Sequence, residues 1–312
     1  MKARALKPND RVGLVAPGAR PESAAAVAYA VRVVQEMGFR AVVGEHVLDA
    51  HGHLAGNDNQ RLSDLDKFIQ DESIAGIFCV TGGFGALPLL ARLDYDAIKD
   101  KPKLFIGSDD NVALLIAVNK VCSLPVVLGP NLDRVRTAES FSSLKTAVTD
   151  TTPITVRCKS DRLGDNIEIP SGYSSFTGVR TGTVMGGSLT GLISLMGTQF
   201  QLEFDDIILY LDDYNERFDI LDRWFTTLYV SGSLDKVAAT IFGDISSCGS
   251  RGNESVLALE DLFGERLKQL RKPNLFGFGM GHNKTSPSIP LGVRARFDTT
   301  NSALEFESAA VE

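Results

Sequence analysis

Along residues 1–135, short apolar runs alternate with longer stretches whose apolar residues follow a helical spacing. The apolar runs are typical of strands, because they are short and are followed by turn-forming residues. Strands that are apolar throughout belong to a parallel sheet with helices on both faces. The pattern therefore predicts a doubly wound, Rossmann-like α/β domain over residues 1–135, with its site at the carboxyl ends of the strands. The predicted strands are residues 11–16, 41–43, 74–80 and 104–106, and the predicted helices are residues 22–37, 59–71, 110–121 and a segment from residue 86.

The alternation is interrupted over residues 136–179, where serine, threonine, aspartate and glycine are frequent. Such a composition predicts a linker with some β structure. Strand and helix patterns return after it, so we expect residues 180–312 to form a second, β-rich α/β domain. Its predicted strands are residues 207–211, 237–242, 275–279 and a last one from residue 301, and its predicted helices are residues 220–228 and 254–270.

The charge and the apolar pattern exclude several kinds of partner. The chain has a formal net charge of −7, which argues against nucleic acid or an anionic membrane surface, because both attract clustered cations. No run of about 18 uncharged apolar residues is present to span a bilayer. Residues 1–8 lack the apolar stretch of a signal peptide. The sequence therefore predicts a cytoplasmic protein.

The cysteines and histidines show only weak signs of metal binding. The cysteines lie far apart without a CxxC pair, so neither a zinc site nor a disulfide framework is predicted. Cys79 and Cys122 belong to apolar runs, and we expect both to be buried thiols. His51 and His53 are separated by one residue, a spacing that also occurs in metal sites. With His46 they belong to a polar loop, and we expect all three to be exposed to solvent.

A glycine-led turn joins the strand at residues 104–106 to the next helix, and this turn has the layout of a nucleophile elbow. Such a turn holds one side chain out at the carboxyl edge of the sheet and directs backbone N–H groups at the same point. Its residues are Gly107-Ser108-Asp109-Asp110. The predicted tip is therefore an aspartate, where a serine would be expected.

Two further candidate groups follow strands of the second predicted domain. Asp212 and Asp213 end an apolar run, and His282 follows another predicted strand. Nucleophile, acid and histidine in this chain order form the triads of several hydrolases. Asp109, Asp212 and His282 are therefore predicted to form one catalytic site.

Around these residues the sequence resembles the LD-carboxypeptidase family, which includes the microcin self-immunity peptidases. The resemblance covers most of the chain, and its matching segments follow one another in the family's order. They include Val15-Ala16-Pro17, Gly82-Gly83-Phe84-Gly85, Phe105-Ile106-Gly107, Gly129-Pro130, Gly186-Gly187-Ser188-Leu189, Leu211-Asp212-Asp213 and Gly281-His282.

The resemblance implies several properties of the whole protein. Members of the family are similar to one another in being cytoplasmic homodimers that use no metal, and no other cofactor is expected. An α/β N-terminal domain holds a nucleophilic serine, and a β-rich C-terminal domain supplies a glutamate and a histidine. They cleave an amide between an L- and a D-centre in murein tetrapeptides, or related amides in peptide-nucleotide antibiotics. The resemblance thus implies a small-molecule or peptide-like substrate.

Several positions depart from the family's pattern. Aligned on the family, Asp109 falls on the nucleophilic serine and Ser108 on a tyrosine. Asp212 falls on the catalytic glutamate and is one methylene shorter, whereas His282 is retained. Thr81 replaces an arginine that usually precedes the two glycines. The largest change is therefore the loss of the hydroxyl that would form the acyl-enzyme.

The resemblance also assigns residues around the triad. It implies an oxyanion hole formed by the backbone N–H groups of Gly83 and Asp110. Beside Asp109 these groups would face a carboxylate that is already charged, so ordinary LD-carboxypeptidase chemistry is expected to fail. Another departure is Leu128, which replaces a histidine. The expected substrate contacts are Gly82, Phe84, Ser108 and Glu216.

Three functions remain open at this point. In the first, the protein is a hydrolase or lyase of altered mechanism. Asp109 then attacks a saturated or strained carbon to form an ester, or acts with His282 as acid and base in an elimination or isomerisation. In the second, a one-residue slip of the turn brings Ser108 to the tip of a true LD-carboxypeptidase. In the third, the protein is catalytically inactive and binds peptide-like ligands or a partner at the same site.

Each member of the predicted triad also has a purely structural interpretation. Asp109 is a favourable N-cap for the helix that follows it. Asp212 stands where it would pair with a lysine or arginine at the strand end. His282 is suited to a turn without any catalytic role.

Overall fold

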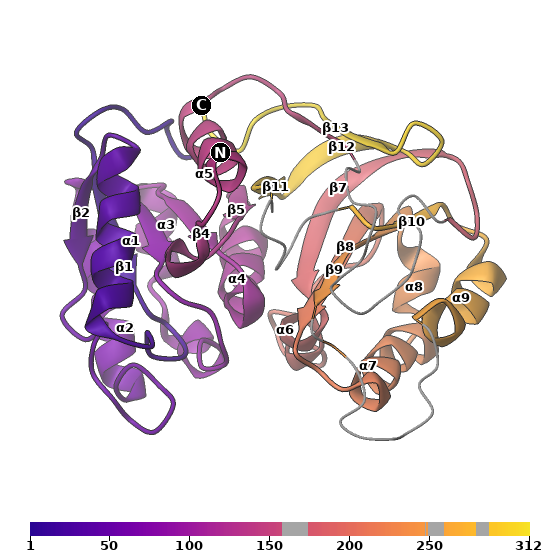
Figure 1. Cartoon of the computed structure of the whole chain (residues 1–312), viewed down its shortest axis with the longest axis horizontal. Helices are drawn as coiled ribbons and strands as arrows, with labels where there is room; N and C mark the ends of the chain where they lie inside the picture. Colours follow the sequence, from indigo (N-terminus) through magenta and orange to yellow (C-terminus); the bar gives the residue numbers. More distant parts are fainter. Residues whose placement is uncertain (158–173, 247, 249–258, 279–286) are drawn as a thin grey trace.

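The computed structural model describes residues 1–157, 174–246, 248, 259–278 and 287–312, and within these ranges the chain forms two lobes (Figure 1). Each lobe is built around one β-sheet with helices beside it. In the described part of the chain, one sheet has six strands and the other has seven. The predicted α/β fold class is confirmed.

The first lobe contains the apolar strands that the sequence predicts. Its strands are β1 (Arg11–Val15), β2 (Arg40–Val43), β3 (Ile74–Cys79), β4 (Leu104–Gly107), β5 (Val126–Leu128) and β11 (Ile289–Leu291). The first five are parallel in the order β2-β1-β3-β4-β5, and β11 is antiparallel to β5 at the edge. Every residue of β3 and β4 is buried, because helices cover both faces of the sheet.

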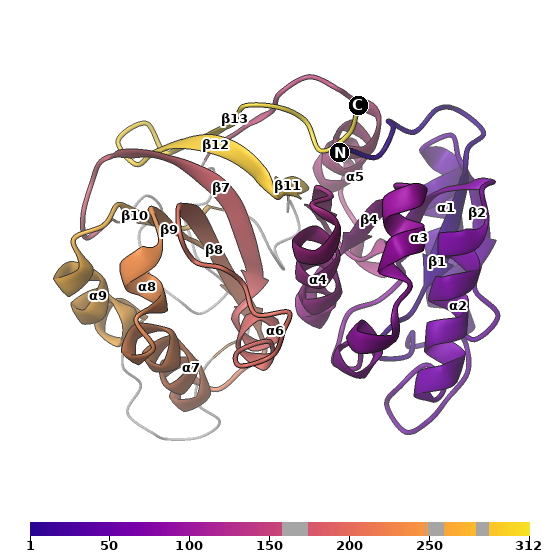
Figure 2. The same ribbon diagram turned by 180° about the vertical axis from the view of Figure 1, so that it is seen from behind.

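The helices of the first lobe form two layers around this sheet. They are α1 (Ala24–Glu36), α2 (Asp58–Gln70), α3 (Tyr95–Asp100), α4 (Val112–Cys122) and α5 (Ala138–Thr149), with the 3₁₀ turns η1 (Leu87–Arg92), η2 (Asp109–Asn111) and η3 (Leu132–Arg134). Helices α2, α3 and α4 lie side by side on one face, and α1 covers the other (Figures 1 and 2). Local sequence sets where α2 begins, since Asn57 and Gln60 form a capping box.

The second lobe contains a mixed sheet. Its strands are β6 (Thr155–Arg157), β7 (Val179–Ser188), β8 (Ile207–Tyr214), β9 (Ala239–Ser246), β10 (Asn274–Phe276), β12 (Val293–Asp298) and β13 (Ala303–Phe306). Strands β7 to β10 are parallel neighbours, and β12, β13 and β6 continue the sheet from β7 in antiparallel pairs. The helices are α6 (Leu189–Ser194), α7 (Phe218–Val230), α8 (Ser233–Lys236) and α9 (Leu259–Leu270).

The predicted linker differs from the observed structure over residues 138–149, which form helix α5. The helix begins at a capping box between Thr137 and Ser140. Leu144 and Val148, four residues apart, are buried on one face. Serine and threonine residues elsewhere in residues 138–149 weaken the helical pattern of apolar residues. The capping box is therefore the clearer indication of a helix in the sequence.

Most other predicted elements overlap observed ones, but the structure differs from the prediction in two further ways. The segment from residue 86 forms the 3₁₀ turn η1, with Pro88 near its start, and not an α-helix. Strand β11 belongs to the first sheet, although it lies inside the range predicted for the second domain. Residues 254–258 and residue 279 of two predicted elements lie outside the described residues. In the described part of the chain, the helices are too short or too polar to cross a membrane.

The chain passes from one sheet into the other within a single residue. Strand β11 ends at Leu291 in the first sheet, and β12 begins at Val293 in the second. Between them, Gly292 has a φ of +80°, and its N–H donates to the carbonyl of Val184 over 2.9 Å. A Cβ atom on Gly292 would lie 2.0 Å from Nδ2 of Asn119, so this junction favours glycine.

A second contact between the lobes joins α4 to α6. Val112, at the start of α4, packs against Gly187 and Gly191 of the second lobe. A Cβ atom would lie 2.4 Å from Val112 Cγ2 if added to Gly187, and 2.5 Å from Val112 Cγ1 if added to Gly191. The two glycines therefore let the lobes approach closely.

This packing predicts the effect of a methyl group at the interface. Gly191→Ala should lower the free energy of unfolding by about 1–3 kcal/mol, because the methyl group overlaps Val112. Val112→Ala should recover part of that loss in the double variant. Urea unfolding measures both effects. Gly264→Ala is the control, because its Cβ would meet no neighbouring atom within 4 Å. Equal losses with and without Val112→Ala would contradict the packing explanation.

Candidate active site

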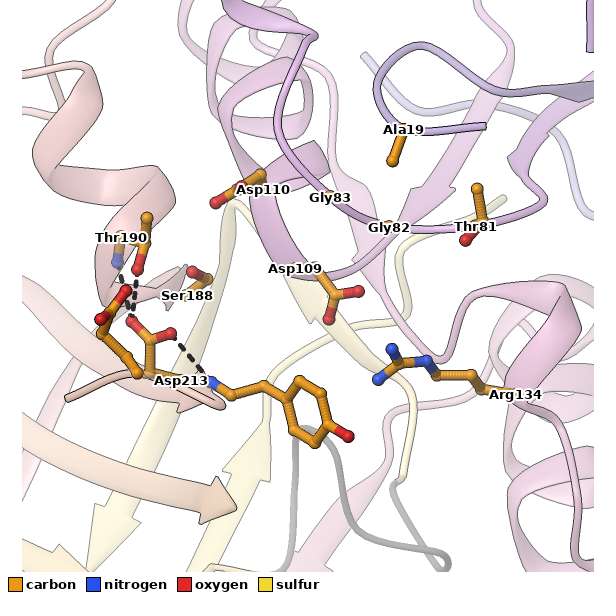
Figure 3. Close-up of a pocket in the computed structure, with 12 residues that line it drawn as sticks. Ala19, Thr81, Gly82, Gly83, Asp109, Asp110, Arg134, Ser188, Thr190 and Asp213 are labelled. Carbon is orange, nitrogen blue, oxygen red and sulfur yellow. Dashed lines mark hydrogen bonds between the residues drawn. The ribbon is translucent and has the colours of Figure 1, made fainter. Parts of the chain in front are cut away.

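A cavity of about 320 Å³ lies between the two lobes. It is formed by segments that follow β1, β3, β4 and β5 in the first sheet and by the ends of β7 and β8 in the second (Figure 3). Ligand sites of open α/β sheets lie at this carboxyl edge. The residues that line the cavity are Ala19, Thr81, Gly82, Gly83, Asp109, Asp110, Arg134, Ser188, Thr190, Asp213, Tyr214 and Glu216.

Asp109 lies in the turn between β4 and α4 and lines the cavity. Its φ of +56° is in the left-handed region, which costs a non-glycine residue about 1–3 kcal/mol. Strain of this kind is typical of nucleophile elbows. Ser108 has extended backbone angles, with φ −146° and ψ −173°, and is not among the residues that line the cavity. The geometry thus distinguishes the two residues and favours Asp109 as the tip.

Two neighbours define the space around the Asp109 carboxylate. Asn131, which follows β5, donates from Nδ2 to Asp109 Oδ2 over 2.9 Å. The segment after β3 passes the same oxygen at Gly82, where a Cβ atom would lie 1.7 Å from Asp109 Oδ2. A side chain at position 82 would therefore displace the carboxylate. No periodic pattern in the sequence marks Asn131 as a site residue, although it directly follows Gly129-Pro130.

Gly83 and Asp110, the predicted donors of an oxyanion hole, line the same cavity as Asp109 (Figure 3). Gly83 has a φ of +88°, a conformation that favours glycine. Asp110 directly follows Asp109 in η2. The three residues therefore lie together, and the role of the two N–H groups stays a prediction.

The two acids near the end of β8 have different surroundings. Asp213 lines the cavity, and its Oδ2 accepts hydrogen bonds from the N–H and the hydroxyl of Thr190, at 2.9 and 2.8 Å. Asp212 is buried, is not among the lining residues, and accepts at Oδ2 from the hydroxyl of Tyr210 over 2.8 Å. Burial, together with the charge of Asp212, raises the pKa of Tyr210 well above its ordinary value.

Arg134 carries the one positive charge among the described residues that line the cavity. Its guanidinium carbon lies 4.9 Å from the centroid of the Tyr214 ring, a cation–π contact between the first lobe and the second. No pattern in the sequence indicates this pair, because the contact depends on how the lobes face each other. The same cavity is lined by the carboxylates of Asp109, Asp110, Asp213 and Glu216.

Only some of the other predicted site residues line the cavity. Gly82 and Glu216 line the cavity, whereas Phe84 is not among the lining residues. Phe84 is half exposed, and its ring centroid lies 6.5 Å from that of His53. His282 lies outside the described residues.

The remaining histidines differ in exposure. His51 and His53 are exposed, as predicted, whereas His46 is partly buried. Nδ1 of His46 lies 2.7 Å from Asp49 Oδ2, and this hydrogen bond raises the pKa of His46. Within the described ranges, the histidines, cysteines and acids form no cluster able to hold a metal ion.

The protein is thus of the two-lobed α/β class, with a cavity between the lobes and a strained turn at that cavity. Comparison with known families makes this more specific. The LD-carboxypeptidase N-terminal domain matches residues 12–129, and the LD-carboxypeptidase C-terminal domain matches residues 181–297. The chain therefore belongs to the LD-carboxypeptidase family, as the sequence motifs predicted.

Relatives are similar along nearly the whole chain. A probable murein peptide carboxypeptidase of Bacillus subtilis is 28% identical, and the match covers 100% of this chain and 96% of the relative. A putative carboxypeptidase of Streptomyces coelicolor is 30% identical, with 98% and 96% covered. Among solved structures, the microcin C7 self-immunity protein MccF, known from Escherichia coli, has a TM-score of 0.87 at 25% identity and 99% coverage of both chains. A muramoyltetrapeptide carboxypeptidase from Oxalobacter formigenes has a TM-score of 0.79 at 21% identity, with 95% and 97% covered.

A buried thiol lies close to the elbow. Cys79 and Cys122 are both buried, which confirms that part of the sequence prediction. Cys79 ends β3, and a Cβ atom on Gly107 would lie 3.1 Å from its Sγ. Burial raises the pKa of the Cys79 thiol to about 12, and the charge of Asp109 adds to the effect.

The raised pKa of Cys79 predicts how stability depends on pH. The unfolded thiol ionises near its ordinary pKa of 9.0, whereas the folded thiol stays protonated until about 12. The stabilising contribution is therefore complete below pH 9 and is lost above it, by about 1.4 kcal/mol per pH unit. Cys79→Ala should show a smaller loss of unfolding free energy than the wild type between about pH 8 and pH 10 in urea titrations. An equal loss in both proteins would contradict this prediction.

Proposed function

We propose that the protein is an enzyme that acts on a small peptide-like molecule through the carboxylate of Asp109 in place of a serine hydroxyl. The observation that carries the proposal is the place of Asp109, which has a left-handed backbone at the cavity between the lobes. Helix capping does not account for it. Ser108 and Asn111 occupy the cap positions of η2 and α4, and neither caps its element through its side chain.

A carboxylate at this position argues against the chemistry of a serine peptidase. It has no hydroxyl to form an acyl-enzyme, and its negative charge stands where the charge of an oxyanion would develop. Ser108 is a poor substitute, because its extended backbone keeps it on the strand side of the turn. The reaction must therefore use the carboxylate itself.

Displacement at a saturated or strained carbon is one reaction open to such a site. An oxygen of Asp109 forms a bond to the carbon as the bond to the leaving group breaks, and the leaving group departs with the electron pair. In the second step, water loses a proton to His282 and attacks the carbonyl carbon of the ester. The alcohol leaves with the proton returned by His282, and the oxygen of the water stays in the carboxylate of Asp109. The part played by His282 rests on the family resemblance.

Proton abstraction is the other reaction that an ionised Asp109 supports. The carboxylate takes a proton from a carbon next to a carbonyl or a leaving group. An elimination or an isomerisation then follows, and no ester forms. The two reactions therefore differ in whether Asp109 becomes covalently modified.

The relatives support a peptide-like ligand. MccF has been solved in complex with glutamyl sulfamoyl guanosine and with aspartyl sulfamoyl adenosine. A relative from Pseudomonas aeruginosa, 28% identical over 91% of this chain, is a murein tetrapeptide carboxypeptidase. The cavity of about 320 Å³ has the size of a small-molecule site. From the family resemblance we also propose a cytoplasmic homodimer.

An aspartate at the tip of the elbow predicts that the protein does not hydrolyse a murein tetrapeptide. The wild type should release no terminal amino acid, because Asp109 cannot form the acyl-enzyme. Asp109→Ser should gain measurable release, and Ser108→Ala should change nothing. Mass spectrometry of the products measures all three. Asp110→Ser is the matched control, since it leaves Asp109 in place and should stay inactive. Cleavage by the wild type that is lost in Ser108→Ala would overturn the proposal.

A second experiment distinguishes ester formation from proton abstraction. Under single-turnover conditions in heavy-oxygen water, an ester mechanism leaves label in the peptide that contains Asp109, whereas a base mechanism does not. On a substrate that the wild type turns over, Asp109→Asn should reduce turnover by about 100-fold or more in either case. Full turnover by Asp109→Asn would exclude the carboxylate from the reaction.

A further inference from the structure

We propose that Asn131 is a positioning residue that holds Asp109 as an ionised carboxylate. The reaction of this site then begins with attack or proton abstraction by Asp109, and not with proton donation from it. This inference rests on the proposed function, because it concerns the state in which Asp109 meets the substrate. Its evidence is the contact between the two side chains.

The side chain of Asn131 does not cap the 3₁₀ turn η3 that follows it. Asn131 is at the N-cap position of η3, where an asparagine commonly accepts a hydrogen bond from the backbone of the element it caps. It makes no such bond. Asn131 is fully buried, and its amide contacts the elbow after β4 instead.

Two hydrogen bonds define which end of the amide faces Asp109. The backbone N–H of Ser108 donates to Asn131 Oδ1 over 3.2 Å, so the amide oxygen faces the backbone of the elbow. The amide nitrogen then faces Asp109 and donates to its Oδ2 over 2.9 Å. An amide NH₂ group can only donate, so this carboxylate oxygen must accept. A donor at this oxygen favours the ionised form of Asp109 over the protonated acid.

Gly82 makes room for this pair. A Cβ atom at Gly82 would lie 1.7 Å from Asp109 Oδ2 and 2.8 Å from Asn131 Nδ2. The amide and the carboxylate therefore occupy the volume that a side chain would need.

The titratable and charged groups around Asp109 are of both signs. Burial raises the pKa of Cys79, so this thiol keeps its proton at neutral pH. Burial also raises the pKa of Asp133, which a hydrogen bond from Thr81 partly opposes. Of the described residues, the others that face the same space are Asp110, Arg134, Asp213, Tyr214 and Glu216.

The test uses chemical labelling, which needs no substrate. Carbodiimide-driven coupling of an amine to a carboxyl group depends on protonation, and mass spectrometry gives its rate at Asp109 as a function of pH. In Asn131→Leu, which keeps a similar volume without the donor, the midpoint should rise by about one pH unit. In Asn131→Asp it should rise further, because two adjacent carboxylates cannot both ionise easily.

A matched control removes a different buried amide. Asn274 is also fully buried, and its Nδ2 donates to Ser175 Oγ at 2.9 Å and to the Lys272 carbonyl at 3.0 Å, in the second lobe. Asn274→Leu should lower stability and leave the Asp109 midpoint unchanged.

An unchanged midpoint in both Asn131 variants would overturn the inference. If Asn131→Leu fails to fold, Asn131→Ala, which also lacks the donor and adds no charge, replaces it in the test. Failure of the proposed function looks different, since Asp109→Asn would then retain turnover. With a substrate in hand, the acid limb of the kcat profile of Asn131→Leu should move to higher pH by the same amount as the labelling midpoint.

Discussion

The site depends on one close contact between three residues. The carboxylate of Asp109 and the amide of Asn131 are hydrogen-bonded, and both pack against the Cα of Gly82. The three residues come from segments that follow the neighbouring strands β3, β4 and β5. Because the three residues fill this space, the side chain at any one of the three positions limits the size of the side chains at the other two. The left-handed backbone of Asp109 is tolerated because this packing holds it in place.

The sequence predicts the scaffold of this site well and its details less well. Buried parallel strands appear as apolar runs, so the first sheet and the elbow could be located. Asn131 could not, because one polar residue after a Gly-Pro pair has no periodic signal. The apolar pattern also does not distinguish Asp212 from Asp213 as the site acid, since the pairing of β8 with β9 is irregular between Leu211 and Asp213. Where a strand is irregular, its alternation does not tell which side chain faces the cavity.

Membership of the LD-carboxypeptidase family explains the architecture and the place of the cavity, whereas the reaction that we propose depends on the residue at the tip of the elbow. A fold can keep its site while the chemistry changes. Here the cavity combines four carboxylates with the guanidinium of Arg134, which contacts Tyr214 across the lobes. A ligand that enters must therefore meet charges contributed by both lobes. The charge pattern of the cavity thus depends on how the two lobes are arranged.

The passage from β11 to β12 has a mechanical consequence for access to the cavity. Since β11 is paired with β5 and β12 with β7, Gly292 is the only residue between the two sheets at that crossing. Sliding of one lobe past the other would break one of these pairings. A change in the width of the cavity between the lobes would therefore have to be taken up by the backbone at Gly292, or one of these pairings would break.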